Sequence, residues 1–85
     1  MNSILDEANR LFLTGKLREA ITYYNKILDQ NPQHVRSLNN KGYALSKLKD
    51  FENAIKCYDI ALENSPYDLS LLVNKISSFR KQKNL

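Results

Sequence analysis

The chain of 85 residues is poor in the residue types that interrupt helices or build reactive sites: it has two glycines, two prolines, one cysteine and one histidine. Cys57, the single cysteine, excludes an intrachain disulfide, and its helical surroundings indicate a reduced thiol. No apolar run approaches the roughly 20 residues of a membrane-spanning helix. Met1 to Ile4 lacks the basic start and apolar run of a secretory signal. We therefore expect a soluble, helix-rich chain in the cytoplasm, with no membrane contact.

Groups for catalysis or metal binding are equally scarce. The sequence has no glycine-rich phosphate loop and no cluster of His, Cys or acidic residues at the spacing of metal ligands. His34 lies in a turn after Pro32, where a solvated or capping imidazole is the simplest interpretation. Asp6 and Glu7 fit solvated or capping roles on a helix. We expect a protein that is not an enzyme and that has no cofactor and no metal site.

The chain does contain an internal repeat with a period of 34 residues. Shifted by this period, it aligns with itself at small, apolar and helix-ending positions: Leu11 with Leu45, Ala20 with Ala54, Ile21 with Ile55, Tyr24 with Tyr58, Leu28 with Leu62 and Pro32 with Pro66. Because these are core and boundary residues, the repeated object is a packed helical unit.

Apolar residues spaced by three and four predict five helices, over residues 3–14, 17–30, 35–48, 51–64 and 69–82. Gly15 is suited to end the first helix in a left-handed conformation, and Pro32 and Pro66 stop the second and fourth. Asp50 and Asp68 are placed as N-caps. Because the connections are short, neighbouring helices must be antiparallel.

This pattern predicts an all-α superhelix of two helical hairpins followed by a closing helix. We expect one domain over residues 1–85, with repeats at 1–34 and 35–68 and a half repeat at 69–85. Ala8 and Gly42 are expected to face Ala20 and Ala54, so that the paired backbones approach closely. Ile76 stands at the equivalent place on the fifth helix, where a further partner helix would need a small residue.

The chain resembles the tetratricopeptide repeat proteins, whose 34-residue unit places Leu-Gly, Tyr, Ala and a final Pro at fixed intervals. The matching positions are Ile4, Glu7-Ala8, Leu11, Ala20, Tyr24 and Pro32 in one repeat, and Leu38, Lys41-Gly42, Leu45, Ala54, Tyr58 and Pro66 in the next. The resemblance implies that first helices line a concave groove and second helices form the convex back. Since successive first helices lie side by side, we expect Glu7 and Lys41 to pair.

The stripe of each first helix that faces away from its hairpin partner combines asparagines with aromatic and basic residues. The candidate groove residues are Asn2, Leu5, Asn9, Phe12, Arg36, Asn39, Asn40, Tyr43, Lys47, Asn74 and Arg80. Asparagines can clamp an extended backbone, rings offer flat apolar contact, and cations supply charge. The leading hypothesis is a non-catalytic module that binds a short peptide segment of a partner protein. Alternatively, the stripe is simply the hydrophilic face of an Asn-rich chain.

One subfamily binds the acidic C-terminal tails of chaperones with asparagines and basic residues. Asn9 and Asn40 match its asparagines, but Leu5, Ser70 and Asn74 stand where its basic residues would be. The resemblance therefore does not extend to that specificity.

A competing hypothesis concerns self-assembly as a scaffold. Leu72, Ile76 and Phe79 form an apolar stripe on the last helix with no following helix to cover it, which favours a homodimer.

The net charge of +4 lies entirely at the C-terminal end. Residues 1–34 and 35–68 are each balanced, whereas the last 17 residues hold four basic side chains and no acidic one. The cluster of Arg80, Lys81 and Lys83 fits either an anionic partner or the complement of a helix dipole. Because aromatic stacking residues are not close by, nucleic acid is a disfavoured partner.

Overall fold

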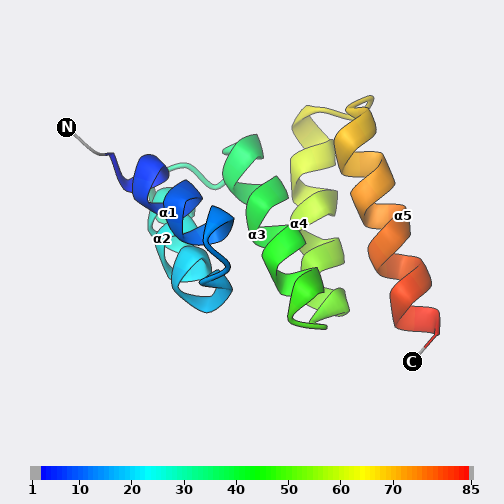
Figure 1. Ribbon diagram of the computed structural model, residues 1–85. Helices are drawn as coiled ribbons and strands as arrows, with labels where there is room; N and C mark the ends of the chain where they lie inside the picture. Colours follow the sequence, from blue (N-terminus) through cyan, green and yellow to red (C-terminus); the bar gives the residue numbers. More distant parts are fainter. Residues whose placement is uncertain (1–2, 85) are drawn as a thin grey trace.

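The computed structural model describes residues 3–84, which form five α-helices joined by short turns (Figure 1). They are α1 (Ile4–Leu13), α2 (Leu17–Gln30), α3 (Val35–Lys47), α4 (Phe51–Asn64) and α5 (Leu69–Lys83). The predicted bounds hold to within one residue, and no strand occurs between residues 3 and 84. α1 pairs with α2, α3 pairs with α4, and α5 packs against α4. The all-α prediction is confirmed.

Four of the five described helices begin at a side chain that accepts a backbone N–H three residues further on. Ser3 caps α1, His34 caps α3, Asp50 caps α4 and Asp68 caps α5. The predicted N-caps Asp50 and Asp68 are thus confirmed, and His34 has the capping role. The exception is α2, whose N-cap is Lys16 and makes no side-chain capping bond.

α1 and α3 end in the same left-handed turn. Gly15 has φ 83° and Lys49 has φ 69°. In both turns the next residue closes the helix end: the Lys16 N–H donates to the Leu11 carbonyl at 2.9 Å and the Asp50 N–H to the Leu45 carbonyl at 2.8 Å. Gly15 adopts this conformation without steric cost, as predicted, whereas Lys49 does so against the preference of a residue with a Cβ.

Each hairpin has a core of small residues around one buried tyrosine. Ala8, Leu11, Ala20 and Tyr24 form the core between α1 and α2. Tyr58 fills the corresponding place between α3 and α4, and a Cβ on Gly42 would lie 2.7 Å from its Cε1 atom. Gly42 therefore makes room for the ring of Tyr58. The sequence had predicted that Ala54 would be its main neighbour.

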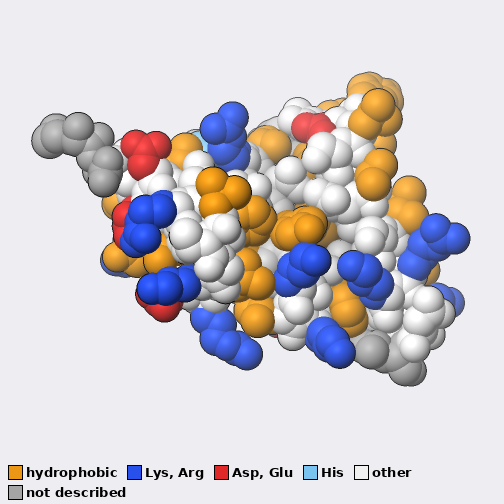
Figure 2. Space-filling view, in the orientation of Figure 1, with side chains coloured by type: hydrophobic (Ala, Val, Ile, Leu, Met, Phe, Trp, Pro, Cys, Tyr) orange, Lys and Arg blue, Asp and Glu red, His pale blue; other side chains and the backbone are white. Residues whose placement is uncertain are grey.

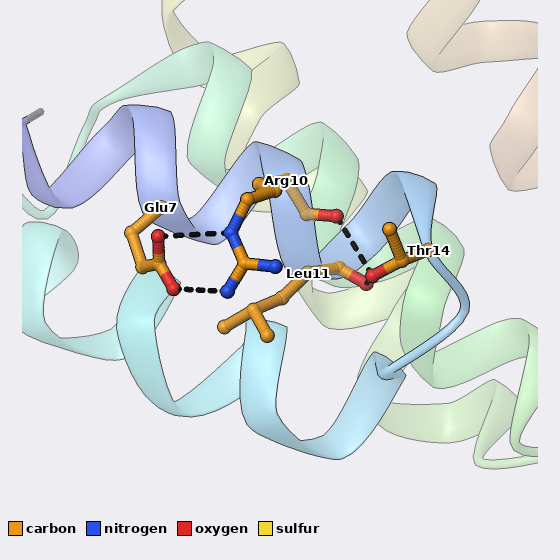
Figure 3. Close-up of polar contacts among 4 residues, drawn as sticks. All are labelled: Glu7, Arg10, Leu11 and Thr14. Atoms are coloured by element: carbon orange, nitrogen blue, oxygen red, sulfur yellow. Dashed lines mark hydrogen bonds and ion pairs between the residues drawn. The ribbon is translucent and has the colours of Figure 1, made fainter.

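The expected Glu7–Lys41 ion pair is wrong. Glu7 instead pairs with Arg10 of its own helix, and Arg10 Nε donates to Glu7 Oε2 at 3.1 Å (Figure 3). This hydrogen bond lowers the pKa of the Glu7 carboxyl. Arg10 is the partner of Glu7, in place of Lys41, because residues three apart lie on the same face of a helix. Figure 3 also shows the Thr14 hydroxyl donating to the Arg10 carbonyl at 2.9 Å, which satisfies one free carbonyl of the last turn.

The helices stack into an elongated body of 41 × 26 × 19 Å. In Figure 1 the α1–α2 turn, the α3–α4 turn and the C-terminal end of α5 lie along the lower edge. None of the helices in the described range has both the length and the apolar character needed to cross a bilayer.

Candidate peptide-binding groove

A hollow of about 510 Å³ lies between α1 and α3. Its lining combines amide, apolar and charged side chains: Asn9, Phe12, Leu13, Val35, Arg36, Asn39, Asn40 and Asp68. Five of the predicted groove residues therefore meet at one place, at the junction of the first and second repeats. Pockets that bind ligands combine apolar walls with a few convergent polar groups in this way.

Three side chains from three helices form a hydrogen-bonded triad at the floor of this hollow. The hydroxyl of Tyr24 (α2) donates to Oδ1 of Asn9 (α1) at 2.5 Å. Nδ2 of Asn40 (α3) donates to the same oxygen at 3.2 Å and to the Tyr24 hydroxyl oxygen at 3.0 Å. Burial raises the pKa of the Tyr24 phenol, although the bond from Asn40 opposes this shift. The phenol is therefore protonated, as its donor role requires.

The triad leaves one donor and one acceptor unused. Asn40 Nδ2 is bonded to both other members of the triad, and Asn9 uses only its oxygen. Within residues 3–84, Asn9 Nδ2 and Asn40 Oδ1 have no hydrogen-bond partner. One amide donor beside one amide acceptor matches the C=O and N–H of an extended peptide unit. Of the expected asparagine clamp, only Nδ2 of Asn9 and Oδ1 of Asn40 therefore remain for a ligand.

Aromatic rings form the apolar wall next to the triad. The Phe12 ring meets Tyr24 edge-on at a centroid distance of 6.4 Å and Tyr43 at 5.6 Å. Tyr43 is 41% exposed, and the Lys47 ammonium lies 5.5 Å from its ring centroid. Phe12, Tyr43 and Lys47 therefore continue the groove from the hollow along α3.

A second pair of asparagines links α3 to α5. Asn74 Nδ2 donates to Asn39 Oδ1 at 3.0 Å, and Asn39 Nδ2 donates to the Ser70 hydroxyl at 3.4 Å. Both functional atoms of Asn39 are thus engaged within the chain. These predicted groove residues hold neighbouring first helices together and present less free polar surface than the first pair.

Two predicted groove residues, Leu5 and Arg80, do not join this site. Leu5 packs against the core between α1 and α2, because its position on α1 faces the hairpin. Arg80 lines a different hollow, on the outer side of α5. Asn2 lies outside the described residues. Three lining residues were not among the candidates: Leu13, Val35 and Asp68. Val35 and Asp68 each stand at a helix start that the sequence pattern assigned to packing or capping.

The outer side of α5 carries an apolar surface that no helix covers. Val73 is 61%, Ile76 56% and Phe79 49% exposed. Ile76 and Phe79 are thus exposed, whereas Leu72 is half-buried and its neighbour Leu71 belongs to the core. Self-association through this stripe stays a prediction. A hollow of about 410 Å³ lies on this outer side, between the apolar side chains and Arg80.

Reactive chemistry has little support among residues 3–84. Cys57 is buried, and burial raises the pKa of its thiol, which makes the nucleophilic thiolate rare at neutral pH. The described part of the chain holds no group of three His, Cys or acidic side chains that is placed to bind a metal ion.

Two comparisons relate the chain to known proteins. A sequence model of the tetratricopeptide repeat matches residues 5–68. Mouse sperm-associated antigen 1 is 28% identical over 79 residues, which cover 93% of this chain and 9% of that protein. The chain thus corresponds to a small part of this much longer relative.

Proposed function

Because the chain belongs to the tetratricopeptide repeat family, whose repeats generally serve as non-catalytic protein–protein interaction modules, we propose that its α1–α3 groove binds a short extended segment of a partner protein. The module acts as one unit over residues 1–85. Its lone buried cysteine fits a reducing compartment, and the cytoplasm is the location that we propose for it.

The observation that supports this proposal is the unused donor and acceptor of the Asn9–Tyr24–Asn40 triad. The Tyr24 hydroxyl fixes the two amides relative to each other, so little side-chain freedom is lost when a ligand binds. Asn9 and Asn40 both line the hollow, as does Phe12. A peptide unit would bond to the two amides while a neighbouring apolar side chain contacts the ring.

The residues around the triad favour an internal segment over a free C-terminal carboxylate. Leu5 packs into the hairpin core, and Asn74 is bonded to Asn39. Neither therefore supplies a cation that would neutralise a terminal carboxylate. Arg36 at the rim of the hollow suits one acidic side chain of the bound segment.

The experiment starts from a peptide selected for binding from a random display library. Asn9→Asp keeps the oxygen that accepts from Tyr24 and Asn40 but replaces the outward amide donor with a second oxygen. We expect peptide affinity to fall about fivefold or more, for a loss of ~1 kcal/mol, with little change in melting temperature. Asn25→Asp on α2 is the matched control, since it changes the charge equally on the convex side. Equal affinity of wild type and Asn9→Asp would contradict the proposal.

The exposed face of α5 supports a second candidate function, which is self-association into a dimer. Ile76 and Phe79 are each about half exposed, and Leu72 lies beside them at the edge of this face. Burial of each large apolar side chain stabilises an interface by roughly 1.5 to 3 kcal/mol. We expect Ile76→Lys together with Phe79→Glu to give a monomer of 9.9 kDa with its helices intact. A wild type that sediments as a monomer at high micromolar concentration would contradict this candidate.

A further inference from the structure

Two lysines stand at turn positions where folding favours other residues. The α1–α2 turn reads Gly15-Lys16, and 34 residues later the α3–α4 turn reads Lys49-Asp50. The left-handed position holds glycine in the first turn and lysine in the second. At the N-cap of the following helix, Lys16 in the first turn makes no side-chain capping bond, whereas Asp50 in the second turn does. The first turn has the favourable glycine and the second has the favourable aspartate, and each has a lysine at the other position. Stability alone therefore does not explain Lys16 and Lys49.

Both turns lie on one edge of the molecule and carry further cations. A hollow places the two turns side by side, and its lining includes one acidic residue: Gly15, Lys16, Leu17, Arg18, Glu19 and Leu48. The Ser78 hydroxyl donates to the Ser46 hydroxyl at 3.0 Å, which places the last turns of α5 beside the end of α3. The resulting basic edge consists of Lys16, Arg18, Lys47, Lys49 and Lys83. In Figure 2 Lys and Arg side chains gather over the lower half of the face, where few acidic ones are visible.

The cations of the basic edge are not neutralised within the described residues. The ion pairs in residues 3–84 join Arg10 to Glu7, Lys56 to Glu52 and Lys75 to Asp59, and none includes a residue of the basic edge. Asp50, the acid nearest to Lys49 in the chain, is occupied with capping α4 and with the side chain of Asn53. The edge therefore presents a row of available positive charges.

We propose that the basic edge, which adjoins the groove at Lys47, is a second docking surface for an Asp/Glu-rich extended segment of a partner protein. A row of exposed lysines attracts a flexible chain of carboxylates over a long stretch without requiring a pocket. The long dimension of the molecule is 41 Å, which about 12 extended residues span.

An acidic polypeptide fits this edge better than a nucleic acid does. Single-stranded nucleic acids are held by aromatic rings on which the bases stack. The two exposed rings near the edge are Tyr43 and Phe79, and a lysine ammonium of the same chain lies 5.5 Å from each ring centroid, Lys47 over Tyr43 and Lys83 over Phe79. One face of each ring is thus already covered.

The experiment measures binding of a fluorescent peptide of about 12 residues that alternates Glu and Ser, at low and at physiological salt. The edge variant is Lys16→Gln with Lys49→Gly, and the latter change also relieves the left-handed strain, so weaker binding cannot result from unfolding. The control variant is Lys26→Gln with Lys56→Gln, which removes two equally exposed charges from α2 and α4. Asn9→Asp tests whether the peptide uses the groove instead. A Gln/Ser peptide and a 12-nucleotide single-stranded DNA complete the set.

We expect the Glu/Ser peptide to bind the wild type and the edge variant to bind about threefold to tenfold more weakly, with the control variant within about twofold of wild type. Added salt should weaken binding by the wild type more than by the edge variant. The proposal is overturned by any of four results: no binding at low salt, equal losses in the two lysine variants, loss with Asn9→Asp but not with the edge variant, or tighter binding of the DNA than of the peptide. The groove proposal stands or falls separately, since its selected peptide is tested with Asn9→Asp.

Discussion

In the first repeat, Asn9 faces the groove and accepts from the hydroxyl of Tyr24, whereas the equivalent position of the second repeat is Tyr43, whose ring packs on Phe12. Tyr58, the counterpart of Tyr24, has its hydroxyl beside Ser78 instead. The same helical frame thus carries a polar clamp at the α1–α3 junction and an aromatic and basic surface further along. The fold depends on the shared residues, and the proposed binding chemistry depends on those that differ.

The close helix contact also differs between the repeats, and this difference carries the largest expected effect. Gly42→Ala would place a Cβ 2.7 Å from the Tyr58 ring, which is rigid and 1% exposed. Alanine normally stabilises a helix by ~1 kcal/mol over glycine, but here overpacking should reverse the sign and cost about 1 to 3 kcal/mol. Thermal unfolding followed by circular dichroism measures it. The reciprocal change, Ala8→Gly, should cost about 1 kcal/mol, and a stabilised Gly42→Ala would show that Tyr58 moves aside freely.

Removal of the hydroxyl that holds the groove triad should have the next largest effect. Tyr24→Phe leaves Asn9 Oδ1 with one donor fewer and the Asn40 amide nitrogen with one acceptor fewer, so we expect a loss of about 1 to 2 kcal/mol in the free energy of unfolding. Chemical denaturation measures this loss. Tyr67→Phe is the control because Tyr67 is 89% exposed, and equal melting behaviour of the two variants would disprove a structural role of the triad.

Exchange of the turn residues between the repeats tests whether the lysines of the basic edge cost stability. Lys49→Gly gives the second turn the residue of the first and should raise the free energy of unfolding by about 1 kcal/mol, because glycine adopts the positive φ without a Cβ clash. Gly15→Lys should lower it by a similar amount. If both exchanges left the melting temperature unchanged, the turns would be insensitive to residue type and the argument from Lys49 would fail.

The smallest expected effect concerns the ion pair within α1. Because Arg10 lowers the pKa of Glu7 in the folded chain below its ordinary value of 4.5, the pair stabilises the fold above that pH and ceases to do so as the pH falls through the lowered pKa. The melting temperature of Glu7→Gln should therefore lie slightly below that of wild type at pH 7, and the difference should shrink as the pH falls below 4.5. A difference that persisted unchanged at pH 3 would rule out the carboxylate as its source.

The sequence predicted the frame of the molecule well because the frame depends on local signals. Apolar spacing and the prolines determined the helices, and the capping aspartates marked their starts. The triad could not be predicted, because its hydrogen bonds depend on how α1, α2 and α3 are shifted along their axes relative to one another. The spacing of apolar residues does not determine these shifts. The left-handed conformation of Lys49 could not be predicted, because lysine has no preference for it. The predicted Glu7–Lys41 ion pair was wrong because Arg10, on the same helix as Glu7, is the nearer partner. The sequence identified Asp68 as a cap but not as a residue that lines the hollow, because periodicity does not show which helices lie next to each other.

The most direct test of the central claim, that the α1–α3 groove binds an extended segment, is an NMR titration of the uniformly ¹⁵N-labelled chain with the display-selected peptide. The account predicts that the side-chain amide signals of Asn9 and Asn40 and the backbone signals of Phe12 and Val35 shift most, while those of Asn25 on α2 stay in place. Shifts confined to α2 and α4, with the Asn9 and Asn40 signals unchanged at saturation, would contradict it.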